Sequence, residues 1–242
     1  MKNIINLTKK ELKDYFISPM AYVIIAAFII VVSIWFLFVS GVFTSNLATM
    51  RDTFIFISQI LIIVIPALTM RSWAEEKKSG TLEVVSTLPI SNLELIFSKF
   101  LSCLIFILIA ITLTFPIPLT LNILGNPDNG IIISSYIGLI FLSASYIVIG
   151  QFVSINSNNQ IVSFILSTVF TFLIYIFGEA QFLQFMPSFS RVVLESLGTG
   201  AHYISIAKGV IDSRDILYFL SIIIILFYFI YRSLERIKKQ GK

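Results

Sequence analysis

Long apolar runs separated by short polar segments limit what this chain can fold into. Six runs reach or approach membrane length, at residues 20–42, 54–70, 97–124, 131–153, 160–177 and 216–231. Because a helix rises about 1.5 Å per residue, about 20 apolar residues cross the hydrocarbon core of a bilayer. Hydrophobic residues make up 57% of the chain and charged residues 12%, which excludes an ordinary soluble domain. The sequence predicts an all-α integral membrane protein with six transmembrane helices in a single domain, residues 1–242.

Residues 1–19 precede the first run and have the pattern of an amphipathic helix lying on the membrane. The apolar side chains on one arc are Ile4, Ile5, Leu12, Tyr15 and Phe16, and those opposite are Lys9, Lys10 and Lys13. A cleaved signal peptide is the competing interpretation. It is disfavoured because the following apolar run is too long and because Glu11 and Asp14 lie in the charged region.

The distribution of Lys and Arg predicts the orientation of the chain. If the N-terminus is cytoplasmic, segments 1–19, 71–99, 154–159 and 232–242 hold 13 of these residues, and the opposite side holds 4. Positive charge collects on the cytoplasmic side of membrane proteins. Both termini and the central polar segment are therefore expected in the cytoplasm, and residues 178–215 outside.

The central segment, residues 71–96, is the sizeable polar stretch between apolar runs, so we expect a soluble partner to bind there. Glu75 to Lys78 is expected to be a charged, solvated segment that leads up to this helix, and Gly80 is expected to interrupt regular secondary structure. Thr81 can cap a short helix that Pro89 stops. Leu82, Val85 and Leu88 share one face of that helix. An ordinary cytoplasmic loop remains the alternative.

The next helix is expected to begin at Ser91, which forms a capping box with Glu94. Pro116 and Pro118 lie near the far end of the same apolar run, where they should kink the helix or end it early.

Chemistry that other membrane proteins need is missing from the sequence. No predicted span has a charged residue or a histidine in its interior, which argues against a proton-coupled transporter or a voltage sensor. There is no H-E-x-x-H, G-x-S-x-G or P-loop motif, so protease chemistry and ATP hydrolysis by this chain are not expected. Cys103 has no second cysteine. His202 has no second histidine, and we expect it to be an interfacial polar residue.

Two further segments are periodic. A polar stripe follows the fifth run at helical spacing, through Gln160, Ser163, Ser167 and Thr171. Helix packing and the lining of a translocation path are both open for it. Between the last two runs, an interfacial or re-entrant helix is expected after a flexible Gly198-Thr199-Gly200. Its predicted apolar face is Tyr203, Ile204, Ala207, Val210 and Ile211.

The central segment resembles the cytoplasmic signature of ABC-2-type permeases, the membrane subunits of ATP-binding-cassette exporters. The matching residues are Arg71-Ser72-Trp73-Ala74-Glu75-Glu76-Lys77-Lys78-Ser79-Gly80-Thr81-Leu82-Glu83, followed by Leu88-Pro89-Ile90-Ser91. Within this family, Gly209-Val210-Ile211-Asp212-Ser213-Arg214-Asp215-Ile216-Leu217-Tyr218-Phe219-Leu220 resembles the gliding-motility-associated permease subunit. The resemblance extends over essentially the whole chain.

The resemblance implies a non-enzymatic permease subunit in the bacterial cytoplasmic (inner) membrane. Its expected partners are an ATP-binding cassette subunit, a second identical or related permease subunit and the lipid bilayer, but no nucleic acid. It implies no cofactor in this chain, with ATP and Mg²⁺ bound by the ATPase, and re-entrant helices within residues 178–215. The implied contacts of a coupling helix with the ATPase are Glu75, Glu76, Gly80, Thr81, Leu82, Glu83, Val85 and Leu88. The alternative function is a non-transporting membrane scaffold.

Overall fold

The computed structural model describes residues 2–42, 49–81 and 90–240, and every regular element in these ranges is a helix. Five helical segments are long and apolar enough to cross a membrane: Pro19–Val39, Arg51–Lys78, Asn92–Leu124, Asn129–Asn156 and Ser213–Lys239. The predicted all-α, multi-pass membrane protein is confirmed at this level. The fifth predicted run forms a shorter apolar helix, Gln160–Ile176.

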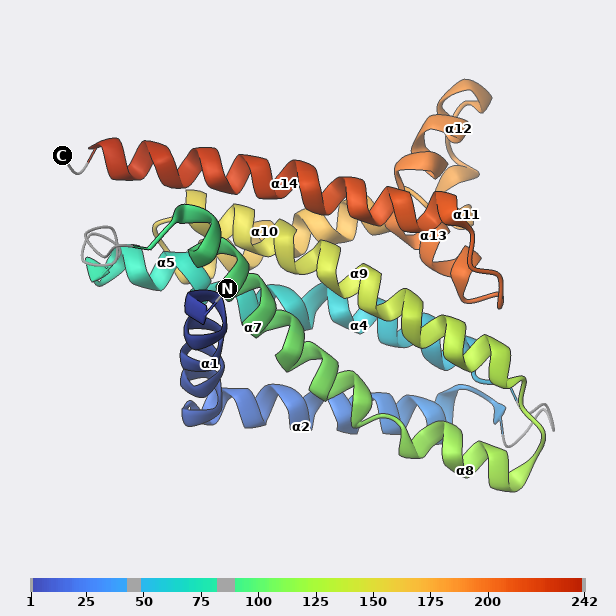
Figure 1. Ribbon diagram of the computed structural model, residues 1–242. Coiled ribbons are helices and arrows are strands. Elements are labelled where there is room, and N and C mark those ends of the chain that lie inside the picture. The colour runs from blue at the N-terminus through green and yellow to red at the C-terminus, as the bar shows by residue number, and fades with distance from the viewer. Residues whose placement is uncertain (1, 43–48, 82–89, 241–242) are drawn as a thin grey trace.

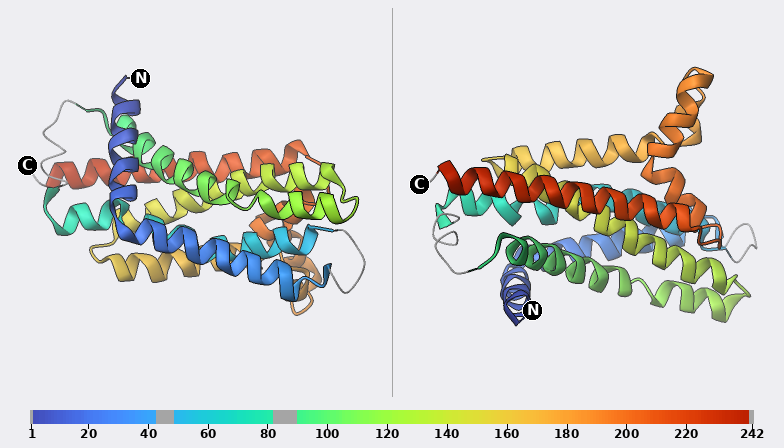
Figure 2. Two further views of the ribbon diagram at one scale, coloured as in Figure 1. Left: turned by 90° about the horizontal axis from the view of Figure 1, so that it is seen from below. Right: turned by 45° about the horizontal axis from the view of Figure 1, so that its top comes forward.

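Six helical segments run side by side along a common direction (Figures 1 and 2). They are α2 (Pro19–Ile34) with the π-helical turn η1 (Trp35–Val39), α4 (Arg51–Thr69), α7 (Asn92–Thr112) with α8 (Pro116–Leu124), α9 (Asn129–Asn156), α10 (Gln160–Ile176) and α14 (Ser213–Gln240). At one end of this bundle, α1 (Lys2–Ile17) crosses the others and packs on α7. The first and last described residues and α5 (Arg71–Lys78) lie at that same end.

Helix α9 is the centre of the bundle and contacts α4, α5, α7, α10, α13 (Thr199–Ile206) and α14. Small residues make this close packing possible, because membrane helices gain no hydrophobic driving force from lipid and depend on close contact. At Gly150 the approach is closest: a Cβ there would lie 2.0 Å from Thr69 Oγ1 on α4. Ser135, Ser143 and Ser145 of α9 are fully buried.

The long third segment begins and breaks as its sequence predicts. The Ser91 hydroxyl accepts from the Glu94 N–H at 3.2 Å, and the Glu94 carboxylate accepts from the Ser91 N–H at 3.1 Å. The helix begins at Asn92, directly after its predicted cap Ser91 and five residues before the apolar run. It stops at Thr112, and α8 restarts at Pro116 after a turn, since proline cannot donate to the preceding turn of a helix.

The last helix is longer than the predicted run 216–231. It starts at Ser213, where the Asp212 carboxylate accepts from the Arg214 N–H at 2.9 Å, and it continues through charged residues to Gln240. Charged residues continue a helix in water as readily as apolar ones do in lipid, so hydropathy alone marked too short an element.

Residues 177–212 form the far end of the bundle, with α11 (Ala180–Leu183), a projecting α12 (Ser188–Leu197) and α13 (Figures 1 and 2). The three residues of Gly198-Thr199-Gly200, which were expected to form a flexible link, are all buried. A Cβ on Gly198 would lie 2.0 Å from the Gly178 nitrogen, so the glycine permits backbone contact. The predicted apolar face is wrong in part: α13 ends at Ile206, and Val210 and Ile211 are exposed.

Candidate functional site

The start of the central polar segment is an amphipathic helix, α5. Of the predicted solvated stretch, Glu75 and Lys78 are exposed, whereas Glu76 and Lys77 are half-buried. Trp73 and Ala74 are fully buried. The charges therefore alternate between solvent and the bundle with the period of a helix. The large indole of Trp73 fixes α5 against the rest of the protein.

A serine from α9 joins α4 to α5. The Ser154 hydroxyl accepts from the N–H groups of Trp73 at 3.1 Å and Ala74 at 3.2 Å, and it donates to the Met70 carbonyl at 3.1 Å. Amides in the first turn of a helix have no partner within that helix. Here their cap comes from 80 residues farther along the chain, so α5 is held to α9. The Lys77 ammonium adds a hydrogen bond to the Ile155 carbonyl.

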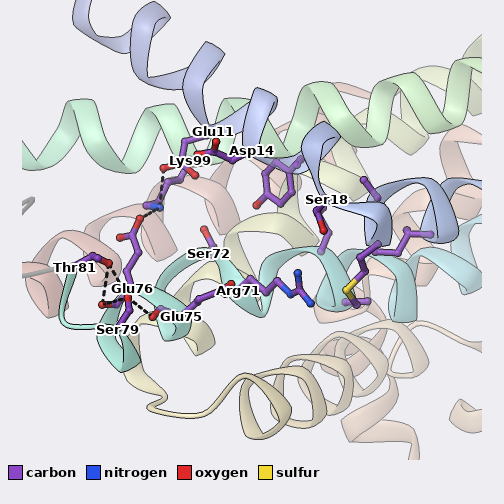
Figure 3. A pocket seen from close by; sticks show the side chains of 16 residues that line it. Glu11, Asp14, Ser18, Arg71, Ser72, Glu75, Glu76, Ser79, Thr81 and Lys99 are labelled. Atoms are coloured by element: carbon purple, nitrogen blue, oxygen red, sulfur yellow. Dashed lines mark hydrogen bonds and ion pairs between the residues drawn. The ribbon is translucent and has the colours of Figure 1, made fainter.

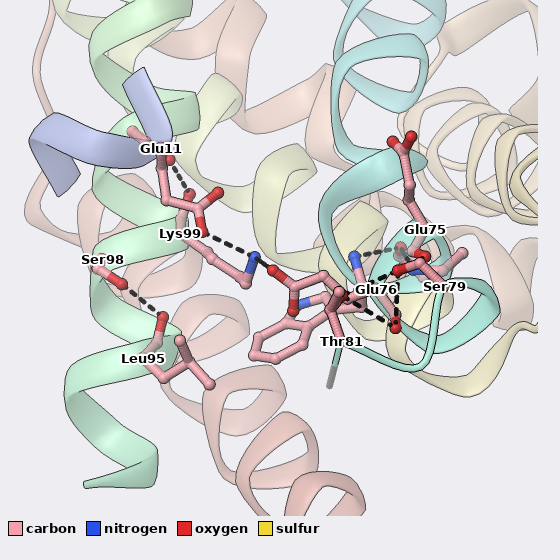
Figure 4. Close-up of polar contacts among 12 residues, drawn as sticks. Glu11, Glu75, Glu76, Ser79, Thr81, Leu95, Ser98 and Lys99 are labelled. Carbon is pink, nitrogen blue, oxygen red and sulfur yellow. Dashed lines mark hydrogen bonds and ion pairs between the residues drawn. The ribbon is translucent and has the colours of Figure 1, made fainter. Parts of the chain in front are cut away.

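A buried lysine joins three helices at this end of the bundle. Lys99 on α7 is 1% exposed, and its Nζ lies 3.0 Å from Glu11 Oε1 of α1 and 2.6 Å from Glu76 Oε1 of α5 (Figure 4). The same ammonium lies 5.1 Å from the centroid of the Trp73 ring, a cation–π distance. A buried charge is tolerated only when it is paired, so Lys99 fixes α1, α5 and α7 relative to one another.

The C-terminus of α5 follows the predicted break at Gly80. Gly80 has φ +72° and donates its N–H to the Lys77 carbonyl at 3.2 Å, a common helix C-terminal arrangement. Thr81 donates its hydroxyl to the Glu76 carbonyl at 3.3 Å. The short helix that Thr81 is predicted to cap lies outside the described residues. Leu82, Glu83, Val85 and Leu88 lie outside the described residues.

A pocket of about 390 Å³ lies between α1, α2, α4 and α5, next to the Lys99 cluster (Figure 3). One wall is apolar, with Met20, Ala21, Ile24, Ala67 and Leu68. The other wall is polar, with Glu11, Asp14, Ser18, Arg71, Ser72, Glu75, Glu76, Ser79, Thr81 and Lys99. The phenol of Tyr15 also lines it, and burial raises the pKa of that phenol well above its usual value. No motif in the sequence indicates this pocket, because its walls come from separate helices.

The polar stripe of α10 lies against other helices of the same chain. Ser163, Ser167 and Thr171 are fully buried and Gln160 is half-buried. Thr171 donates to the Ile62 carbonyl of α4 at 3.3 Å. Tyr175 extends the stripe by one turn, with its hydroxyl 3.3 Å from the Ser58 hydroxyl. This arrangement favours the packing interpretation within one chain.

His202, predicted as an interfacial polar residue, contacts two residues at the start of α14. Its Nδ1 lies 2.6 Å from Asp215 Oδ1, and its ring stacks on Tyr218 with 3.9 Å between centroids. The pair joins α13 to α14. Within the part of the chain that the structure describes, no three His, Cys, Asp or Glu residues are placed to hold a metal ion.

Comparison of the sequence with models of protein families and with curated proteins finds no match. The candidate functional site therefore consists of the charged and polar residues at the α1–α5 end of the bundle. Among them, Lys99 and Ser154 link α5 to α1, α7 and α9.

Proposed function

We propose that this chain is the membrane-spanning permease subunit of an ATP-binding-cassette exporter, and that a separate subunit hydrolyses the ATP. The observation that carries the proposal is the bracing of α5. This helix emerges from the bundle, is tied to α1, α7 and α9, and leads directly into residues 82–89.

Bracing suits force transfer, because a rigid connection passes a displacement on to its neighbours. A displacement of residues 82–89 would reach α9 through Ser154 and Lys77, and α7 and α1 through Lys99. Nothing in this path requires ATP chemistry in the chain itself. A plain loop would need no buried ion pair to hold its base.

The topology that we propose has six spans, with α10 as the shortest. Its 17 residues cover about 26 Å, close to the hydrocarbon thickness of a bilayer. The α1–α5 end carries the greater share of Lys and Arg and is proposed to face the cytoplasm of a bacterial cell. A second identical or related permease subunit would complete the transporter.

Leu82→Asp tests the proposal. We expect the variant to insert and fold. It should neither co-purify with a P-loop ATPase encoded beside it nor stimulate that ATPase, because burying an unpaired charge in a protein–protein interface costs about 2–5 kcal/mol. The matched control is Leu197→Asp at the opposite end, where Leu197 is 52% exposed; it should co-purify normally. Normal ATPase binding by Leu82→Asp, or ATP hydrolysis by the isolated chain, would refute the proposal.

A non-transporting membrane scaffold is the rival function. A scaffold would retain its partners without ATP turnover and would show no substrate-dependent change in the ATPase rate. Measuring ATP turnover of the reconstituted complex beside its assembly separates the two.

A further inference from the structure

The pocket beside the Lys99 cluster contains buried polar atoms without partners. Arg71 Nε, Ser72 Oγ and Glu76 Oε2 are each shielded from solvent, and none has a hydrogen-bond partner within the described residues. Ser72 is only 5% exposed. Leaving such atoms unpaired costs free energy. Figure 3 shows the Ser72 hydroxyl turned toward α1 and Arg71 extending along the pocket toward the start of α2.

The charges of the pocket wall are unbalanced. Four carboxylates (Glu11, Asp14, Glu75 and Glu76) face two cations, Arg71 and Lys99. Lys99 is already paired with Glu11 and Glu76. Arg71, Asp14 and Glu75 have no ion pair within the described part of the chain. A ligand that completes this site carries an anion for Arg71 and Ser72, and a cationic N–H donor for the carboxylates.

The position of the pocket indicates which kind of ligand would fit it. It lies where α1 meets the first turn of α2, and α2 is one of the membrane-crossing helices. Its apolar wall consists of side chains from α2 and α4. Polar groups at the end of an apolar wall match an amphiphile with its head near the water and its chains in the bilayer.

We propose that this pocket binds the head group of a phospholipid that carries a primary amine, with the phosphate on Arg71 and Ser72 and the ammonium among Asp14, Glu75 and the free Glu76 oxygen. Arg recognises phosphate with two parallel hydrogen bonds. A primary ammonium has three N–H donors, which a quaternary ammonium lacks. The proposal does not depend on the permease assignment, because the lipid contacts only this chain.

Native mass spectrometry of the full chain in detergent tests the proposal, with dioleoyl-phosphatidylethanolamine, dioleoyl-phosphatidylcholine and dioleoyl-phosphatidylglycerol as probes. The amine lipid should be retained about tenfold better than the other two, since one charge-assisted hydrogen bond is worth at least about that factor. Arg71→Gln should lower retention of the amine lipid about tenfold. The control Arg51→Gln, an exposed arginine at the opposite end of α4, should change nothing.

Ser72→Ala provides a second readout that does not depend on the folding of the Arg71 variant. Deleting an unpaired buried hydroxyl should leave the melting temperature of the lipid-free protein unchanged or higher, while binding of the amine lipid falls severalfold. Equal retention of the three lipids, or wild-type lipid binding by both variants, would overturn the proposal. Displacement of the lipid by an equal concentration of free phosphoethanolamine would also overturn it, because the ligand would then be a soluble zwitterion.

Discussion

At the scale of single residues, the charged groups near the membrane boundary have two different roles. Lys9, Lys10 and Lys13 are exposed on α1, whereas Lys99 is buried between two carboxylates. All four contribute equally to a count of positive charges. Only Lys99 determines how helices meet, because burial makes its pairing obligatory.

Lys99→Met should destabilise the α1–α5 end. Glu11 and Glu76 would then face each other without a cation; because both are about one-fifth exposed, water offsets part of the cost, and we expect about 2 kcal/mol. Thermal unfolding in detergent, with hydrogen exchange of the α1 amides, measures the effect. Lys9→Met on the exposed face is the control. Unchanged exchange in α1 would show that Lys99 does not brace this helix.

Ser154→Ala should loosen α5 without disturbing α9. The variant leaves two buried N–H groups unpaired, and each costs about 1 kcal/mol or more. The hydrogen-exchange rates of the Trp73 and Ala74 amides should rise at least tenfold. Native-state hydrogen exchange measures these rates. Ser157→Ala is the matched control, because that hydroxyl donates only to the Val153 carbonyl of its own helix and its loss should be mild.

The sequence predicted contacts between residues that lie close together in the chain, but not contacts between residues that lie far apart in the chain. The Ser91–Glu94 capping box spans three residues and could be read directly. The partners of Lys99 lie 88 and 23 residues away, and the cap of α5 lies 80 residues away. Pairing across helices depends on the packing of the whole bundle, which no local pattern encodes.

At the scale of elements, apolar periodicity predicted that the helices exist but not always where they end. Hydropathy marked only the apolar parts, so α14 proved longer than its run 216–231, and α7 began five residues before its run 97–124 and ended within it, at Thr112. The prolines at 116 and 118 correctly indicated a break. Small residues predict close contact, but which helix fills the space beside Gly150 or Gly198 emerges only from the fold.

Gly150→Ala tests the contact between α4 and α9. The new Cβ would lie 2.0 Å from Thr69 Oγ1 and 2.9 Å from Thr69 Cβ. Thr69 is β-branched and cannot easily rotate away, so the helices must separate, at about 2 kcal/mol. Thermal unfolding in detergent measures the loss. Thr69→Ala in the same chain removes the nearest atom and should restore part of it. An unchanged unfolding temperature in the Gly150→Ala variant would mean that α4 and α9 pack less closely here than the structure shows.

At the scale of the whole molecule, the bundle has two unlike ends. One end holds α1, α5, the Lys99 cluster and the head-group pocket. The other holds the α7–α8 break and the projecting α12. The sequence predicted which segments share an end, because alternate connections between spans must emerge on the same side. It could not predict that the Lys99 ion pairs brace the α1–α5 end, or that the His202–Asp215 pair and the Gly178–Gly198 contact join helices at the other end.

The orientation of the two ends can be measured by cysteine labelling. In a Cys103→Ser background, Lys78→Cys should resist an impermeant thiol reagent in intact cells and react after lysis. Phe189→Cys, at an 84%-exposed position on α12, should react in intact cells. The reverse pattern would invert the proposed topology.

The central position of α9 also has a consequence for how the protein is made. Two of its main partners, α10 and α14, follow it in the chain, and α14 begins 57 residues after α9 ends, at Ser213 against Asn156. Until α14 is inserted, one side of α9 has only lipid or the insertion machinery beside it. The bundle therefore reaches its final packing only after α14 has been inserted, and a chain that stops before Ser213 would present α9 as an unfinished surface to membrane quality control.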